Sequence, residues 1–150
     1  MNEQVSRSQP QAGEGHRTGP VVLLVDDEPR ILSALVRALR REGYELLSAE
    51  TPGEALRLAE QYAIDCVLSD HKMPGMTGLE LIERLARVRP QAARLLITGW
   101  NTEIDPDELT RLGVRRVLSK PWEDAELKRA LRSALEGAGC RFASEKAQPG

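Results

Sequence analysis

Apolar residues along the chain follow two patterns that alternate from one end to the other. Short and nearly continuous apolar runs are typical of strands buried on both faces of a sheet, and they predict strands over residues 21–25, 45–49, 64–69, 93–98 and 114–119. Between these runs, apolar residues recur at helical spacing, which predicts helices over 29–39, 52–61, 78–88, 106–112 and 123–136. Such alternation across short loops predicts an α/β fold, a doubly wound five-stranded parallel sheet with five helices.

Proline, glycine and capping residues mark where several of these helices begin or end. Pro29 suits the first position of a helix, and Gly43 follows the end of the same helix. Thr51 and Glu54 have the spacing of a capping box, in which each side chain bonds the backbone N–H of the other. The stretch before the short helix over 106–112 shows no periodicity, which fits either a segment that reorganises or an ordinary loop.

The two ends of the chain lack this periodicity. Their polar composition cannot bury enough surface to offset the entropy of ordering, so we expect a disordered leader over 1–19, one domain over 20–137 and a flexible tail over 138–150. The leader contains no apolar stretch that could serve as a signal peptide, and no run in the chain approaches the length needed to span a bilayer. We therefore expect a cytoplasmic protein without a membrane partner.

Composition adds no further element to this fold, but it argues against direct nucleic-acid binding and against a metal or redox site built from cysteines. The 150 residues carry a formal net charge of −2 and only 3% aromatic residues, so neither a basic surface nor base-stacking side chains indicate direct nucleic-acid binding. The two cysteines, Cys66 and Cys140, fit no metal or redox spacing. Cys66 lies within an apolar run and is interpreted as a small buried side chain.

Polar residues follow four of the five predicted strands at the point where each strand ends. Asp26 and Asp27 follow the first, Asp70 the third, Thr98 ends the fourth and Lys120 follows the fifth. Taken singly, each has an ordinary explanation as a helix cap, a strand end or a turn. The carboxyl ends of parallel strands, however, meet at one edge of the sheet, where three carboxylates would repel one another strongly.

A divalent cation would relieve that repulsion. Oxygen ligands and a partly hydrated shell favour Mg²⁺. A carboxylate nucleophile beside Mg²⁺, with a lysine and a hydroxyl in reach, is suited to accepting a phosphoryl group, because that chemistry needs mainly positioning and positive charge. The residues therefore predict a magnesium-dependent site for phosphoryl transfer.

Four segments in order resemble the receiver domain of bacterial response regulators over about residues 21–136. They are Leu24-Val25-Asp26-Asp27-Glu28, Ser69-Asp70-His71-Lys72-Met73-Pro74-Gly75-Met76-Thr77-Gly78, Leu96-Ile97-Thr98-Gly99 and Ser119-Lys120-Pro121. The resemblance implies a flavodoxin-like sheet with strand order 2-1-3-4-5.

The resemblance also implies a role for each site residue. Asp70 would be the phosphoacceptor, Thr98 would hydrogen-bond the phosphoryl group, and Lys120 would pair with Asp70 and then with a phosphoryl oxygen. Asp27 would bind Mg²⁺ directly and Asp26 through water. The full implied metal site consists of Asp26, Asp27, Asp70 and the backbone carbonyl of Lys72.

Some positions depart from the family or vary within it. The family commonly has Tyr or Phe where this chain has Val117, and a valine cannot act as an aromatic rotamer switch. Trp122 either takes part in signalling or packs against the last helix. Pro121 matches a position where the family usually has a cis peptide bond. Lys72 and Trp100 occupy variable positions that flank the path of the attacking water, and Trp100 either shields the acyl phosphate or anchors a partner.

These features predict a stand-alone response regulator that takes a phosphoryl group from a sensor histidine kinase or phosphotransfer protein. It would signal by binding an output protein of unknown identity or by forming a phosphorylation-dependent dimer. We expect no turnover of external substrates, since related aspartyl-phosphate hydrolases have an aspartate where this chain has Lys72. The alternatives are a phosphorylation-independent receiver-like binding module and a receiver fragment of a larger multidomain regulator.

Overall fold

Five parallel strands form one sheet at the centre of the computed structural model, which describes residues 19–99 and 102–137. The strands are β2 (Val21–Val25), β3 (Glu45–Ala49), β4 (Cys66–Asp70), β5 (Ala93–Gly99) and β6 (Val114–Lys120). Their order in the sheet is β3-β2-β4-β5-β6, which confirms the predicted doubly wound order 2-1-3-4-5. The order reverses between β2 and β4, and ligands of such sheets bind beside this point at the carboxyl ends of the strands.

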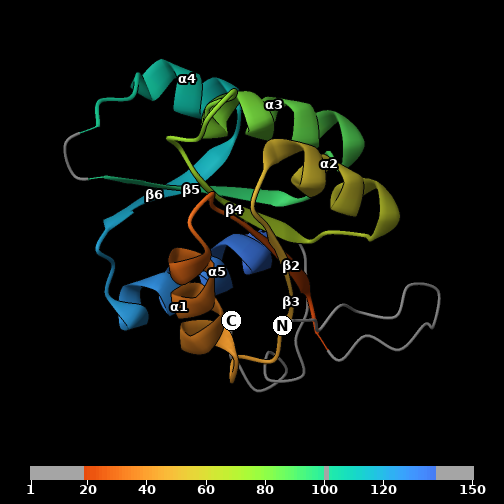
Figure 1. Ribbon diagram of the computed structural model, residues 1–150, viewed down its shortest axis with the longest axis vertical. Coiled ribbons are helices and arrows are strands. Elements are labelled where there is room, and N and C mark those ends of the chain that lie inside the picture. Colours follow the sequence, from red (N-terminus) through yellow and green to blue (C-terminus); the bar gives the residue numbers. More distant parts are fainter. Residues whose placement is uncertain (1–18, 100–101, 138–150) are drawn as a thin grey trace.

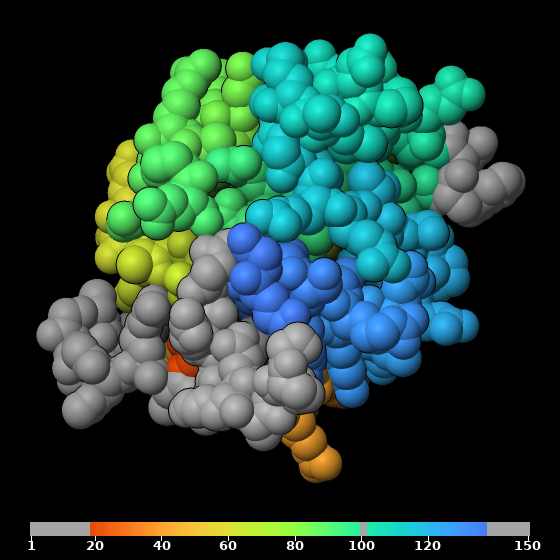
Figure 2. All heavy atoms as spheres, turned by 180° about the vertical axis from the view of Figure 1, so that it is seen from behind, coloured from red at the N-terminus to blue at the C-terminus, as the bar shows by residue number. Residues whose placement is uncertain are grey.

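Five helices cover the two faces of the sheet (Figure 1). They are α1 (Pro29–Leu39), α2 (Pro52–Gln61), α3 (Gly78–Val88), α4 (Pro106–Arg111) and α5 (Asp124–Gly137). Helices α1 and α5 lie on one face, whereas α2, α3 and α4 lie on the other. The space-filling view from behind shows α4 and β6 in cyan beside α5 in blue (Figure 2). None of the described helices is both long and apolar enough to cross a membrane.

The core consists of two apolar layers that share the sheet. Strand β2 is buried along its whole length, so its side chains alternate between the layers: Val22 and Leu24 pack toward α1 and α5, while Leu23 packs toward α2 and α3. This burial on both faces confirms the interpretation of the continuous apolar run. Cys66 is fully buried in the layer with α1 and α5, as its apolar neighbours predicted.

Local details correct two predictions. The strand expected over 64–69 begins at Cys66 and includes Asp70, because Ile64 is buried in the core without being part of the strand. Asp65 joins the neighbouring strand β2 at its start: its N–H donates to the Val21 carbonyl and its Oδ2 accepts from the Val21 N–H, each at 2.8 Å. Only half of the capping box at α2 forms. Thr51 Oγ1 accepts from the Glu54 N–H, but Glu54 accepts from the Glu50 N–H and not from that of Thr51.

The other bounds agree with prediction to within one residue. The Lys120–Pro121 peptide bond is cis, as the resemblance implied. The tail over 138–150 and all of the leader except Gly19 lie outside the described residues, as does Trp100.

Candidate functional site

The ends of four neighbouring strands bring the predicted polar residues to one edge of the sheet. Strands β2 and β4 run parallel, with Val25 beside Ser69. The next residues, Asp26 and Asp70, therefore lie side by side at the ends of neighbouring strands. On the other side of β4, Asp70 pairs with Ile97, the residue before Thr98. The sequence alone could name these residues, but strand order and register place them beside one another.

Three carboxylates lie close together at this edge. Asp26, Asp27 and Asp70 each offer an oxygen, and these oxygens all lie within 4.8 Å of one another. Asp26 and Asp70 are almost fully buried, at 0% and 4% exposed, while Asp27 is open to solvent. This arrangement has two buried acidic groups and one side open to an incoming ion or substrate.

Asp26 does not serve as a helix cap. The N-cap residue of α1 is Glu28, which forms no cap with its side chain. Asp26 Oδ1 instead accepts a hydrogen bond from the Glu28 N–H at 2.9 Å, which fixes the carboxylate in the turn after β2. The capping explanation for this acidic pair is therefore wrong, and Asp26 is held in place with its second oxygen directed into the cluster.

Lys120 joins two of the carboxylates. Its Nζ lies 3.1 Å from Asp26 Oδ2 and 3.1 Å from Asp70 Oδ1. The expected pairing was with Asp70 alone, so the contact with Asp26 was missed by sequence reasoning. One ammonium among three ionised carboxylates leaves a net charge of −2, which is the charge that one divalent cation neutralises.

The pKa values of the pair follow from these contacts. Burial raises the pKa of Asp70 above its ordinary value, and the charge of Asp26 adds to the shift while Lys120 opposes it. Burial alone would lower the pKa of Lys120, but pairing with Asp26 and Asp70 outweighs burial and raises it. Lys120 is therefore charged at neutral pH, and Asp70 carries an energetic cost of ionisation that further positive charge would reduce.

The second oxygen of Asp26 indicates where that charge fits. Asp26 Oδ2 is buried and accepts no hydrogen bond of good geometry from a described residue, so its stabilisation depends on the ion pair with the Lys120 ammonium at 3.1 Å. A hydrated hard cation would add positive charge beside it, and carboxylate and carbonyl oxygens are ligands that suit Mg²⁺. The donor set therefore fits Mg²⁺.

The backbone of Asp70 is fixed by two residues that sequence reasoning did not single out. Ser69 Oγ donates to the Asp70 carbonyl at 2.9 Å. A Cβ on Gly78 would lie 2.4 Å from that carbonyl oxygen, so only glycine permits this approach. In the sequence, a glycine at the first helical position, directly after the capping Thr77, is the feature that could have indicated this close approach.

Val117 and Trp122, the two residues considered for signalling of phosphorylation, differ in how far they are covered. Val117 is 38% exposed and is the one large apolar side chain found exposed among the described residues. Trp122 packs against the core layer that contains α5, and its Nε1–H donates to Asp124 Oδ1 at 3.1 Å. The packing explanation for Trp122 is thus confirmed, and Val117 lies exposed on β6.

Comparison with known proteins gives a consistent assignment. Residues 22–132 match the response regulator receiver domain family. The chain is 35% identical over 115 residues to the transcriptional regulatory protein GlrR of Escherichia coli, covering 77% of this chain and 26% of GlrR. It is 31% identical to protein PilH of Pseudomonas aeruginosa over 118 residues, covering 77% of this chain and 98% of PilH. The chain thus spans about a quarter of the length of the first regulator and nearly all of PilH.

Solved structures show the same fold. The signal receiver domain of an HD domain-containing protein from Pseudomonas fluorescens is 36% identical with a TM-score of 0.73, over 81% of this chain and 98% of that domain. A CheY-like receiver domain protein from Methanospirillum hungatei is 29% identical with a TM-score of 0.74, over 80% of this chain and 96% of that chain. This chain therefore belongs to the response regulator receiver domain family of two-component systems, whose general function is to be phosphorylated on an aspartate.

Proposed function

We propose that Asp70 is the residue phosphorylated in this chain and that Asp26, Asp27, Asp70 and the backbone carbonyl of Lys72 hold the Mg²⁺ it requires. The observation that carries this proposal is the pair of 3.1 Å contacts from Lys120 to Asp26 and Asp70. Asp27 completes the carboxylate cluster. No other group of three acidic, histidine or cysteine side chains with this spacing exists in residues 19–99 and 102–137.

Phosphoryl transfer at this site can be followed through its own side chains. Lys120 holds Asp70 Oδ1, so Oδ2 is the oxygen open to attack a phosphohistidine phosphorus. The new O–P bond forms as the P–N bond breaks, and the electron pair of that bond leaves with the imidazole. The Lys120 ammonium then exchanges its contact with the Asp70 carboxylate for one with a phosphoryl oxygen. The Thr98 hydroxyl donates a hydrogen bond to another phosphoryl oxygen. Bound Mg²⁺ supplies positive charge to the phosphoryl oxygens.

The proposed donor is a sensor histidine kinase or a phosphotransfer protein, and the proposed output is a partner protein or a phosphorylation-dependent dimer in the cytoplasm. No turnover of external substrates is expected, because Lys72 stands where an acid/base aspartate would be needed. Since the chain spans about a quarter of its regulator relatives such as GlrR, a receiver within a larger regulator remains an alternative to a stand-alone protein.

Transfer from candidate autophosphorylated kinases, with and without Mg²⁺, tests the assignment of Asp70. We expect the intact protein to gain the mass of one phosphoryl group only with Mg²⁺, and Asp70→Asn to gain none. Asp107→Asn, an equal charge change at an exposed position on α4, serves as the control. Labelling of Asp70→Asn at the normal rate would overturn the assignment.

Val117 gives specific reason to test the alternative of a phosphorylation-independent binding module, because it lacks the ring used for the common readout. Beryllofluoride mimics the acyl phosphate, and Trp122 offers a fluorescent reporter near the end of β6. A shift that requires Mg²⁺ and intact Asp70 supports a working switch. An absent shift in well-folded protein favours the binding module.

A further inference from the structure

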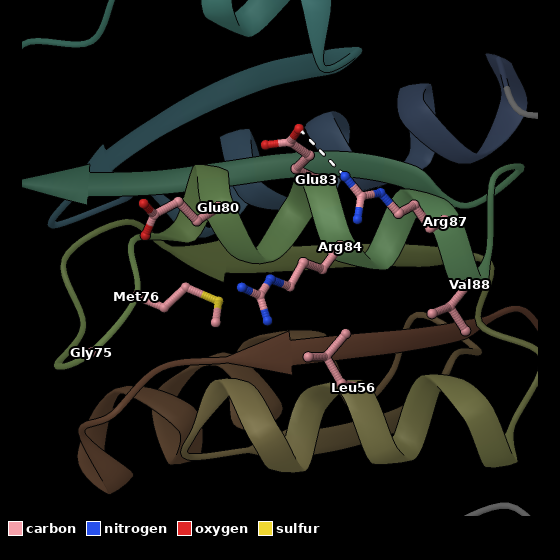
Figure 3. A pocket seen from close by; sticks show the side chains of 8 residues that line it. All are labelled: Leu56, Gly75, Met76, Glu80, Glu83, Arg84, Arg87 and Val88. Atoms are coloured by element: carbon pink, nitrogen blue, oxygen red, sulfur yellow. Dashed lines mark ion pairs between the residues drawn. The ribbon is translucent and has the colours of Figure 1, made fainter.

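A cleft separate from the carboxylate cluster runs between α2 and α3 (Figure 3). Its volume is about 630 Å³, within the range of pockets that bind ligands. The loop between β4 and α3 closes one end with Gly75 and Met76. Helices α2 and α3 supply the rest of its lining.

The floor of the cleft is apolar and held in place by the core. Leu56, Met76 and Val88 are partly buried and pack against the buried layer beneath α2 and α3. They come from two helices and the intervening loop, so their relative positions depend on the packed fold and not on one flexible segment. An aliphatic side chain placed on this floor would lose its contact with water.

Two glutamates and two arginines line the cleft, and one of the arginines has no ion pair with a described residue. Glu80 lies one helical turn before Arg84 and would be its usual partner, but Glu80 Oε1 accepts from the Thr77 N–H at 2.9 Å in the capping box of α3. Glu83 is approached by Arg87 and Arg111, each at 3.9 Å. Arg84 has no acidic partner among the described residues.

The Arg84 side chain lies over the floor with its guanidinium exposed. Figure 3 shows it extending between Met76 and Leu56, while the Glu80 carboxylate points away toward the loop. A guanidinium presents parallel N–H donors that match a carboxylate. An apolar floor beneath one unpaired guanidinium therefore fits a group that combines an aliphatic side chain with a neighbouring carboxylate.

We propose that this cleft is a docking site for a partner-protein segment that places a Glu or Asp carboxylate on Arg84 and an adjacent aliphatic side chain on Leu56, Met76 and Val88. The segment is a polypeptide and not a small ligand, because the cleft is open to solvent and not enclosed: Glu80, Arg84 and Arg87 of its lining are exposed. The site does not depend on phosphoryl transfer, so it can be tested with unphosphorylated protein in the absence of Mg²⁺.

The test uses two peptides of opposite charge, acetyl-Glu-Leu-Leu-Glu-amide and acetyl-Lys-Leu-Leu-Lys-amide, titrated into ¹⁵N-labelled protein. We expect the acidic peptide to shift the amide resonances of residues that line the cleft and to bind about fivefold more tightly than the basic peptide. Arg84→Gln should weaken the acidic peptide by a similar factor. Arg57→Gln, an exposed arginine of α2 that does not line the cleft, should bind like the parent.

Four results with the peptides and variants would overturn the proposal, and a fifth would come from octanoate. They are equal affinity for the two peptides, shifts confined to another face, an equal effect of Arg57→Gln and Arg84→Gln, and no shift at millimolar peptide. Octanoate supplies the same carboxylate and aliphatic chemistry without a peptide. If octanoate binds as tightly as the acidic peptide, the cleft is a small-molecule site and the proposed polypeptide partner is wrong.

Discussion

Lys120 balances two carboxylates that the fold buries. Its ammonium lies 3.1 Å from both Asp26 and Asp70 while its side chain is only 24% exposed. Removing one member of such a buried cluster leaves uncompensated charge, which costs far more than losing a surface ion pair. Lys120 and a divalent cation act on the same carboxylates, so each should reduce the cost of losing the other.

Replacing Lys120 tests this overlap. Lys120→Met keeps the length of the side chain but removes its charge, and we expect it to lower the free energy of unfolding by about 2 kcal/mol in metal-free protein. Mg²⁺ should recover a substantial part of that loss, because it supplies charge to the same oxygens. Urea unfolding with and without Mg²⁺ measures both effects. Arg57→Met removes a positive charge at an exposed position outside any described ion pair and outside the proposed metal site, and it should change stability little. A loss in Lys120→Met that Mg²⁺ leaves unchanged would contradict the overlap.

Asp70 should make stability fall as pH rises. Its pKa in the folded chain lies above the ordinary value of 3.8, so between these two pKa values the folded state binds more protons than the unfolded state. The free energy of unfolding therefore decreases through this window, and the loss persists at neutral pH. Without Mg²⁺, Asp70→Asn should be more stable than the parent at pH 7, with the difference vanishing as the pH falls below 3.8.

Melting temperatures across this pH range, measured without Mg²⁺, provide the comparison. Asp107→Asn makes the same charge change at an exposed position and controls for the effect of net charge. A parent protein as stable at pH 7 as Asp70→Asn would show that ionised Asp70 carries no cost in the fold.

At the scale of elements, the start of α3 and the end of β4 are packed without room for a side chain. Gly78 opens α3, and its N–H donates to the His71 carbonyl at 2.7 Å. A Cβ there would lie 2.4 Å from the Asp70 carbonyl oxygen and 2.8 Å from His71 Cα. Both neighbours are backbone, so neither can move without moving the strand end that carries Asp70.

Two glycine substitutions in helices should have opposite effects. Gly78→Ala should destabilise the fold by at least about 2 kcal/mol, because backbone must shift to admit the methyl group. Gly53→Ala in α2 meets nothing within 4 Å and should be neutral or stabilising by up to about 1 kcal/mol, since alanine favours helix. Urea unfolding compares them, and equal effects would mean that helix propensity, not the close approach, governs Gly78.

At the scale of the whole molecule, the site gathers contributions from chain segments far apart in sequence. Its parts lie at the ends of β2, β4, β5 and β6, so it exists only when the sheet is assembled. A ligand that binds this assembled site and not the unfolded chain stabilises the entire fold.

Mg²⁺ should therefore raise the melting temperature of the whole domain. At a concentration ten times its Kd, the gain is about 1.4 kcal/mol, or about 5 °C for a domain of this size. Asp27→Asn should remove most of this gain with little change in metal-free stability, because Asp27 is exposed. Scanning calorimetry with Mg²⁺ measures the shift. An undiminished gain in Asp27→Asn would exclude Asp27 as a ligand.

Much of the fold could be predicted from local pattern. The continuous apolar run of β2 and the helical spacing in α3 gave their bounds directly, because burial on two faces or on one stripe leaves a period in the sequence. The start of β4 was predicted two residues too early, since Ile64 is buried in the core but lies outside the strand, and the apolar run records only the burial. The hydrogen-bond partner of Glu54 was wrong for a different reason: competing N–H donors one residue apart look alike in sequence.

The sequence by itself determined the order of strands and helices and, through its motifs, the residue types at the strand ends. Tertiary structure decided that Lys120 contacts Asp26 as well as Asp70, that the Gly78 backbone packs against the Asp70 carbonyl, and that Arg84 lies without an ion pair to any described residue over the apolar floor of a cleft. Periodicity records whether a residue is buried, which is a local property of each element. Distances between residues tens of positions apart depend on strand order, register and helix packing, which form only when the whole chain folds.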